Sequence, residues 1–300
     1  MFMTQRRTDL AVEAHQLWRE GAGDGAALSG VRAEERERDG FQVSAVSIDS
    51  PEGAKALGKP EGVYITIELD GLLRREEEAF QRAVGAVAAE LRPLLPPTGP
   101  ALVMGLGSRT VTPDLIGPFA VDHLLVTRHL VEGIPEHFGH LRPVAAAAPG
   151  VLASTGLESS LIAQALAGAV KPACVVAVDA LASRSLDRLC RTVQLSDTGV
   201  IPGSGVGNHR RPLNRETLGV PVLTVGAPTV VDGATLALDL LERAGHTGTD
   251  RGDLPGGEEF FVTPREVDQR VADMGKVLGY AVSLALNPSL SLDDLVMLLE

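Results

Sequence analysis

The feature that most constrains this chain is a regular alternation of apolar and helical segments between residues 101 and 245. The run ACVVAVDAL (173–181) is apolar almost throughout, as expected of a strand buried on both faces of a parallel sheet. Similar strands are predicted over 101–106, 143–148 and 221–228, with helices over 115–131, 155–170 and 229–245. This alternation predicts an α/β fold: a single domain with a mostly parallel sheet flanked by helices on both faces, plus an N-terminal arm.

The segments outside this region have patterns of their own. FQVSAVSID (41–49) and GVYITIELD (62–70) alternate apolar and polar residues, which is typical of strands. Residues 72–95 have helical periodicity and stop before two prolines, and a long helix is predicted over 263–286. Residues 1–40 are polar, with a short helix around Trp18, and TVQLSD (192–197) is a candidate strand.

Charge and apolar run lengths exclude several classes of protein. The formal net charge of −12 argues against a DNA-binding surface, which needs clustered Lys and Arg. No apolar run reaches about 18 residues, so no transmembrane helix is expected. The N-terminus lacks the apolar core of a secretory signal. We therefore expect a cytoplasmic protein with neither a membrane nor a nucleic acid as direct partner.

The stretch GLGSRTVTPDLIGP (105–118) leaves a predicted strand through two glycines and enters a helix. A dinucleotide-binding turn needs GxGxxG directly before the helix, but Thr110 stands where the third glycine belongs. The chain also contains no Walker sequence, so nucleotide binding is disfavoured. The stretch instead places Asp114 behind Thr112 and Pro113, where an acidic residue in a first helical turn also suits a purely structural role.

Asp179 ends the apolar run CVVAV, where an ionised carboxylate is costly unless it is paired or hydrogen-bonded. It either has a structural role, by capping the following turn or by binding backbone amides, or takes part in catalysis. Asp114 and Asp179 follow two predicted parallel strands, so both belong at the edge of the sheet where α/β proteins bind ligands. If those strands are neighbours, the two carboxylates face one cleft and share a proton, and one activates water while the other protonates a carbonyl.

Other catalytic constellations are weaker. The histidines at 123, 129, 137 and 140 show no HExxH pattern, although a metal site joining Asp114 or Asp179 with His123 or His129 stays open as an alternative. Ser154 and Ser204 lack the GxSxG elbow of a serine hydrolase.

Seven blocks of the sequence form a pattern when they are taken together: RTDLAVEA (7–14), GLGSRTVTPDLIGPFAVDHLLVTRHL (105–130), PGVLASTGLES (149–159), VAVDALASRSLDRL (176–189), QLSDTGVIPGSGVGN (194–208), ETLGVPVLTVGAPTVVDG (216–233) and VTPREVD (262–268). These blocks resemble the germination proteases of endospore-forming bacteria. The resemblance implies an atypical aspartic endopeptidase with a phosphorylase/hydrolase-like fold, related to hydrogenase-maturation proteases. Its two catalytic aspartates map onto Asp114 and Asp179, with no metal and no cofactor.

The resemblance also implies a biological setting. Family members degrade small acid-soluble spore proteins when germination begins, so the spore core, or forespore, is the expected location and a homotetramer the expected assembly. They are made as zymogens that remove a short N-terminal segment, here a propeptide-like segment 1–10 before a peptidase domain at 11–300, with cleavage at about Leu10–Ala11. Ser108 departs from the family's usual Asn after GLG, and the loop 246–261 is shorter than in many members.

Overall fold

The computed structural model describes residues 6–23, 26–73, 76, 78–204, 210–246, 248–254 and 260–299. The strands are β1 (Val31–Arg38), β2 (Phe41–Ile48), β3 (Gly62–Glu68), β4 (Ala101–Gly105), β5 (Val144–Ala147), β6 (Cys174–Ser183), β7 (Thr192–Ser196), β8 (Val222–Asp232) and β9 (Phe261–Val262). The helices are α1 (Ala11–Ala22), α2 (Pro51–Leu57), α3 (Asp70–Leu73), α4 (Ala79–Leu91), α5 (Ile116–Asp122), α6 (Arg128–Gly133), α7 (Pro135–Phe138), α8 (Leu152–Thr155), α9 (Ser159–Val170), α10 (Arg215–Leu218), α11 (Gly233–Arg243), α12 (Val267–Leu286) and α13 (Leu292–Leu299).

One mixed sheet organises these elements. The described strands lie in the order β1-β2-β3-β7-β8-β6-β4-β5, and β9 pairs with β8. Strands β8, β6, β4 and β5 are parallel, whereas β1, β2, β3 and β7 join through antiparallel pairs. The α/β single-domain class is confirmed. The expectation of a mostly parallel sheet holds only for the half that follows strand–helix–strand crossovers, because consecutive strands such as β1 and β2 return directly and pair antiparallel.

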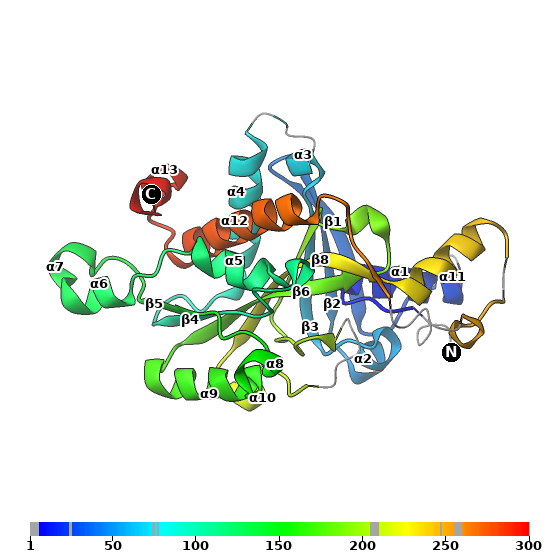
Figure 1. Ribbon diagram of the computed structural model, residues 1–300, viewed down its shortest axis with the longest axis horizontal. Coiled ribbons are helices and arrows are strands. Elements are labelled where there is room, and N and C mark those ends of the chain that lie inside the picture. Colours follow the sequence, from blue (N-terminus) through cyan, green and yellow to red (C-terminus); the bar gives the residue numbers. More distant parts are fainter. Residues whose placement is uncertain are drawn as a thin grey trace.

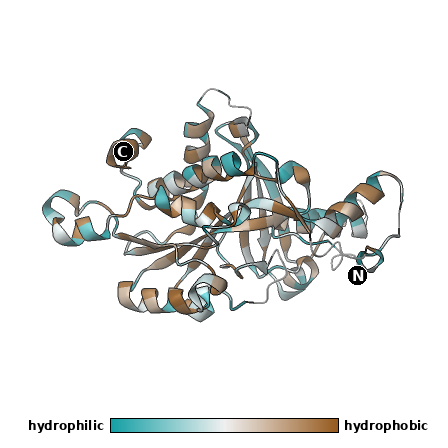
Figure 2. Ribbon diagram, viewed as in Figure 1, coloured by the Kyte–Doolittle hydropathy of each residue, from teal (hydrophilic) through white to brown (hydrophobic). Residues whose placement is uncertain are grey.

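Helices cover both faces of the sheet (Figure 1). On one face α4, α5 and α12 pack on the larger hydrophobic cluster, to which β4 contributes Ala101 and Val103. On the other face α9 packs over Leu102 and Met104 of the same strand, and α1 and α2 cover β2 and β3. Figure 2 shows hydrophobic residues along the central strands and mixed hydropathy along the covering helices. The alternation within β4 follows from the two-residue period of a strand.

Three predicted helices differ from the observed ones. The helix predicted over 115–131 is broken between α5 and α6, because Thr127 is fully buried and bonded to the chain entering β5. Its hydroxyl donates to the Arg142 carbonyl and accepts from the Val144 N–H. Among the described residues, the helix predicted over 72–95 is divided into the end of α3 at Leu73, α4 and a short 3-10 turn at Arg92–Leu94. Strand β8 continues through residues 229–232, where a helix was expected to begin.

Strand β1 forms one edge of the sheet and has β2 as its partner. Its sequence VRAEERER carries six charged residues among eight, and seven of the eight are exposed. Arg36 and Arg38 reach the buried carboxylate of Glu90 on α4. Because β1 lacks an apolar face, its sequence does not show the alternation that predicts a strand. The strand is recognised in the structure by its pairing with β2.

Candidate active site

The glycine turn after β4 allows α5 to pack against the end of the strand. A Cβ on Gly105 would lie 2.3 Å from the carbonyl oxygen of Gly117 in α5. A Cβ on Gly117 would lie 2.1 Å from the Leu106 carbonyl oxygen. Both positions therefore require glycine for a close approach between helix and strand. The backbone of α5 therefore packs directly against the turn, where a phosphate-binding loop would need free N–H groups.

A third glycine, Gly107, fixes the place of Asp114. Its φ of +113° is a conformation that favours glycine, and a Cβ there would lie 2.0 Å from the Asp114 carbonyl oxygen. The Ser108 N–H donates to Asp114 Oδ2 at 2.8 Å. Residues Thr112–Asp114 form a 3-10 turn whose N-cap is Val111, so Thr112 is the first residue of the turn and not its N-cap. The Asp114 carboxylate is held by the glycine turn instead of capping a helix.

Asp179 lies inside the adjacent parallel strand β6, just beyond the point where its pairing with β4 ends. Strands β4 and β6 pair in register with Gly105 opposite Val178, so Asp179 is the next residue beyond the pairing. Its side chain is 5% exposed, and Oδ1 accepts the Ala180 N–H at 3.0 Å. Asp114 and Asp179 both line a cleft of about 330 Å³. The structure thus brings together the two carboxylates that the sequence singled out.

The electrostatics of the cleft favour a shared proton. Burial raises the pKa of Asp179 well above its ordinary value, and the charges of Asp114 and Asp9 raise it further. Burial also raises the pKa of Asp114, while the Ser108 N–H and the Arg210 charge act in the opposite direction. A carboxyl with a raised pKa stays protonated at a pH where isolated carboxyls are ionised, and the repulsion between two such groups disfavours the ionisation of both. Such a pair combines a general acid with a general base.

Arg210 and Thr229 also line the cleft. Thr229 is the extra residue of a bulge in β8, because Leu181 pairs with Pro228 while Ala182 pairs with Val230. Bulges redirect side chains and are common beside active sites. The Thr229 hydroxyl is buried and has no hydrogen-bond partner among the described residues. Sequence analysis missed both residues, since Arg210 follows a glycine-rich loop and a bulge leaves no mark in a single sequence.

The N-terminal arm reaches the same cleft. Asp9 lines it, and its carboxylate accepts the Ala182 N–H at 2.8 Å and the Ser204 hydroxyl at 3.0 Å. Leu10 and Ala11 are fully buried. The Leu10 carbonyl accepts the Ala14 N–H of the first turn of α1. The candidate cleavage bond therefore lies inside the folded structure, at the start of a helix.

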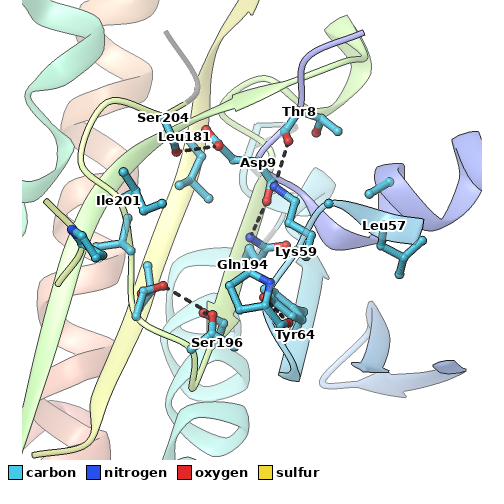
Figure 3. A pocket seen from close by; sticks show the side chains of 18 of the residues that line it. Thr8, Asp9, Leu57, Lys59, Tyr64, Leu181, Gln194, Ser196, Ile201 and Ser204 are labelled. Carbon is cyan, nitrogen blue, oxygen red and sulfur yellow. Dashed lines mark hydrogen bonds between the residues drawn. The ribbon is translucent and has the colours of Figure 1, made fainter. Parts of the chain in front are cut away.

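A larger cavity of about 690 Å³ also borders the arm. Asp9 and Leu181 line both cavities, so the two cavities are adjacent. In Figure 3 Lys59 reaches the Thr8 carbonyl, Gln194 bonds the Asp9 carbonyl, and Ser204 bonds the Asp9 carboxylate. This cavity contains neither Asp114 nor Asp179, so the smaller cleft is the candidate active site.

The histidines proposed for a metal site lie outside the cleft. His123 stacks on Phe119 and bonds its carbonyl oxygen, and His129 is exposed on α6. Neither lines the cleft with the two aspartates. Within the described ranges, no three His, Cys, Asp or Glu side chains are grouped so that they could hold a metal ion. The described helices also include none long and apolar enough to cross a membrane.

Comparison with known proteins gives consistent matches along the chain. The sequence profile of the family described as germination protease matches residues 11–251. A germination protease of Clostridium perfringens is 39% identical over 320 residues, covering 96% of this chain and 97% of the relative. One from Caldanaerobacter subterraneus subsp. tengcongensis is 38% identical over 323 residues and covers 98% of each chain.

A solved structure, the [NiFe] hydrogenase maturation protease HycI of Thermococcus kodakarensis, aligns with 66% of this chain and 98% of its own. The sequences are 16% identical and the TM-score is 0.38, which is too low to support an argument about fold or function.

Proposed function

This chain belongs to the germination protease family, a family of endopeptidases, and we propose that Asp114 and Asp179 are the pair with which it hydrolyses peptide bonds. The observation that carries the proposal is the position of both carboxylates in one cleft, each with a raised pKa. The substrates we propose are small acid-soluble spore proteins, degraded in the spore core at germination. A protein with a net charge of −12 would meet such substrates away from DNA.

In the proposed mechanism, the more deeply buried Asp179 carries the shared proton and Asp114 is ionised. Asp114 removes a proton from a water molecule, whose oxygen attacks the peptide carbonyl carbon, while Asp179 protonates the carbonyl oxygen. The resulting neutral diol collapses when Asp114 returns its proton to the leaving nitrogen and Asp179 recovers its proton from a diol hydroxyl. The products are a carboxylic acid and an amine, and the pair regains its initial protonation.

We also propose that the chain is a zymogen that cleaves itself at Leu10–Ala11, and that it works as a homotetramer. Both residues are fully buried, and the Ala11 N–H donates to Gln194 Oε1 at 2.7 Å. Self-cleavage therefore requires the first turn of α1 to open. The proposed propeptide-like segment 1–10 includes residues 1–5, which lie outside the described part of the chain.

Substitution of the two aspartates tests the catalytic proposal. Asp114→Asn and Asp179→Asn should each lower the cleavage of a spore-protein substrate by roughly 10²–10⁴-fold, because each removes a general acid or base. Asp49→Asn is the matched control, since Asp49 is exposed and pairs with Arg32. Normal turnover by either active-site variant would refute the assignment. Activity that is lost in EDTA and restored by a divalent metal would support a metal-dependent peptidase instead.

A further inference from the structure

Strand β6 extends past its neighbour β4 and leaves an edge beside the cleft. The last backbone hydrogen bond between β6 and the chain leaving β4 joins the Leu106 N–H to the Val178 carbonyl. Beyond it β6 continues to Ser183 with β8 as its strand partner. The edge at Ala180–Ala182 directly follows Asp179, and all three residues line the cleft. An open strand edge is the kind of surface that binds an extended peptide through main-chain hydrogen bonds.

The arm occupies this edge in the structure. The Asp9 N–H donates to the Ala182 carbonyl at 2.8 Å, and the Asp9 carboxylate accepts the Ala182 N–H. Leu10 packs with Val12 against Leu181 of the same edge. The arm thus satisfies both backbone groups of Ala182 and covers the neighbouring apolar side chain.

Gln194 of β7 clamps the backbone of the arm from the other side. Its amide nitrogen donates to the Asp9 carbonyl at 3.0 Å, and its amide oxygen accepts the Ala11 N–H at 2.7 Å. The side chain is 6% exposed, so these groups need partners whenever the site is closed. A side-chain amide that bonds the main chain on both sides of one residue recognises peptide backbone, whatever side chain that residue carries.

We propose that the arm segment 7–11 lies where the substrate binds, and that the β6 edge at Ala182 together with the Gln194 amide forms the peptide-binding groove of the enzyme. The inference rests on the proposed function, because the groove can present a substrate for cleavage only if the adjacent aspartates are catalytic. An extended substrate chain replaces the arm, takes over the bonds to Ala182 and Gln194, and passes Asp179 and Asp114. Gln194 is thus a substrate-positioning residue.

A binding assay on the full chain tests the groove separately from catalysis. All variants carry Asp114→Asn, and the probe is a fluorescent peptide with the sequence of residues 6–12, followed by anisotropy. Asp9→Ala removes the two hydrogen bonds of the Asp9 carboxylate that hold the arm, and it leaves the groove intact. Because the arm then competes less well for the groove, the Asp9→Ala chain should bind the peptide about tenfold to a hundredfold more tightly than the chain that retains Asp9. Adding Gln194→Glu replaces the amide donor with a carboxylate of similar size, and this second change should cancel the gain in peptide affinity.

Gln164→Glu is the matched control, because Gln164 is exposed on α9 and the change alters the charge equally. The groove is refuted if Asp9→Ala leaves peptide binding unchanged, or if the Gln194 and Gln164 variants bind the peptide equally. If the Gln194 variant fails to fold, amide exchange decides: the peptide should protect the Ala182 N–H in the Asp9→Ala chain, and an unprotected amide refutes the groove. Mass spectrometry shows whether the probe stays intact. Cleavage of the probe by an Asp114→Asn chain would refute the catalytic role of Asp114, but it would not refute the groove.

Discussion

Replacing Gly107 with alanine tests whether the glycine turn positions Asp114. At a φ of +113° a residue with a side chain is strained, at a cost of about 1–3 kcal/mol. The new Cβ would also lie 2.0 Å from the Asp114 carbonyl oxygen and 3.0 Å from Oδ1, so Asp114 must shift, which adds about 1–3 kcal/mol. The free energy of unfolding in urea should fall by about 2–6 kcal/mol in total. Peptidase activity should fall too, because the displaced carboxylate no longer faces the cleft correctly.

Gly58→Ala provides the control for backbone strain alone. Gly58 has a φ of +62° at the end of α2, and a Cβ there would meet no atom within 4 Å. That change should cost about 1–2 kcal/mol and leave peptidase activity intact. If Gly107→Ala is no more destabilising than Gly58→Ala and remains active, the glycine is not needed to position the carboxylate.

Two further predictions concern buried groups of the cleft and the larger cavity. Because the folded pKa of Asp179 is raised above its ordinary 3.8, the stability that its protonated form contributes is present below about pH 4 and is lost as the pH rises through the folded value. Asp179→Asn, which cannot ionise, should therefore unfold at higher urea than the parent at neutral pH and lose this advantage near pH 4, and a pH-independent difference would contradict the assignment. Thr229→Val and Thr224→Val each remove a buried hydroxyl without a partner among the described residues, so each should raise the free energy of unfolding by about 1 kcal/mol. A loss of stability in both variants would mean that these hydroxyls do have partners.

Sequence reasoning correctly predicted that both aspartates lie beyond the paired part of two parallel strands, although Asp179 is inside β6, which continues to Ser183, and Asp114 lies in the turn after β4. Asp179 stood out because a carboxylate at the end of a fully apolar run is energetically unusual. Asp114 followed from the rule that parallel strands end at a common edge. That β4 and β6 are neighbours was a condition of this reasoning, and the observed parallel pairing meets it. Their catalytic role stays a proposal.

The parts of the site that sequence reasoning missed depend on long-range contacts. Asp9 belonged to a polar arm with no evident partner, yet it bonds Ala182, which lies 173 residues further along the chain. Gln194 looked like an ordinary strand residue, and only the docking of the arm gives its amide a role. Local periodicity carries no information on such pairings, because they depend on how the finished sheet positions its edge.

The open edge of β1 has a consequence for how copies of this protein meet. An unpaired strand edge is a template for another chain, and continued edge-to-edge pairing leads to aggregation. Here six of the eight residues of β1 are charged, so a second strand adding there would strip water from charges on both faces. This edge therefore disfavours ordered self-association in a concentrated solution. Any assembly of several copies should be built through a different surface.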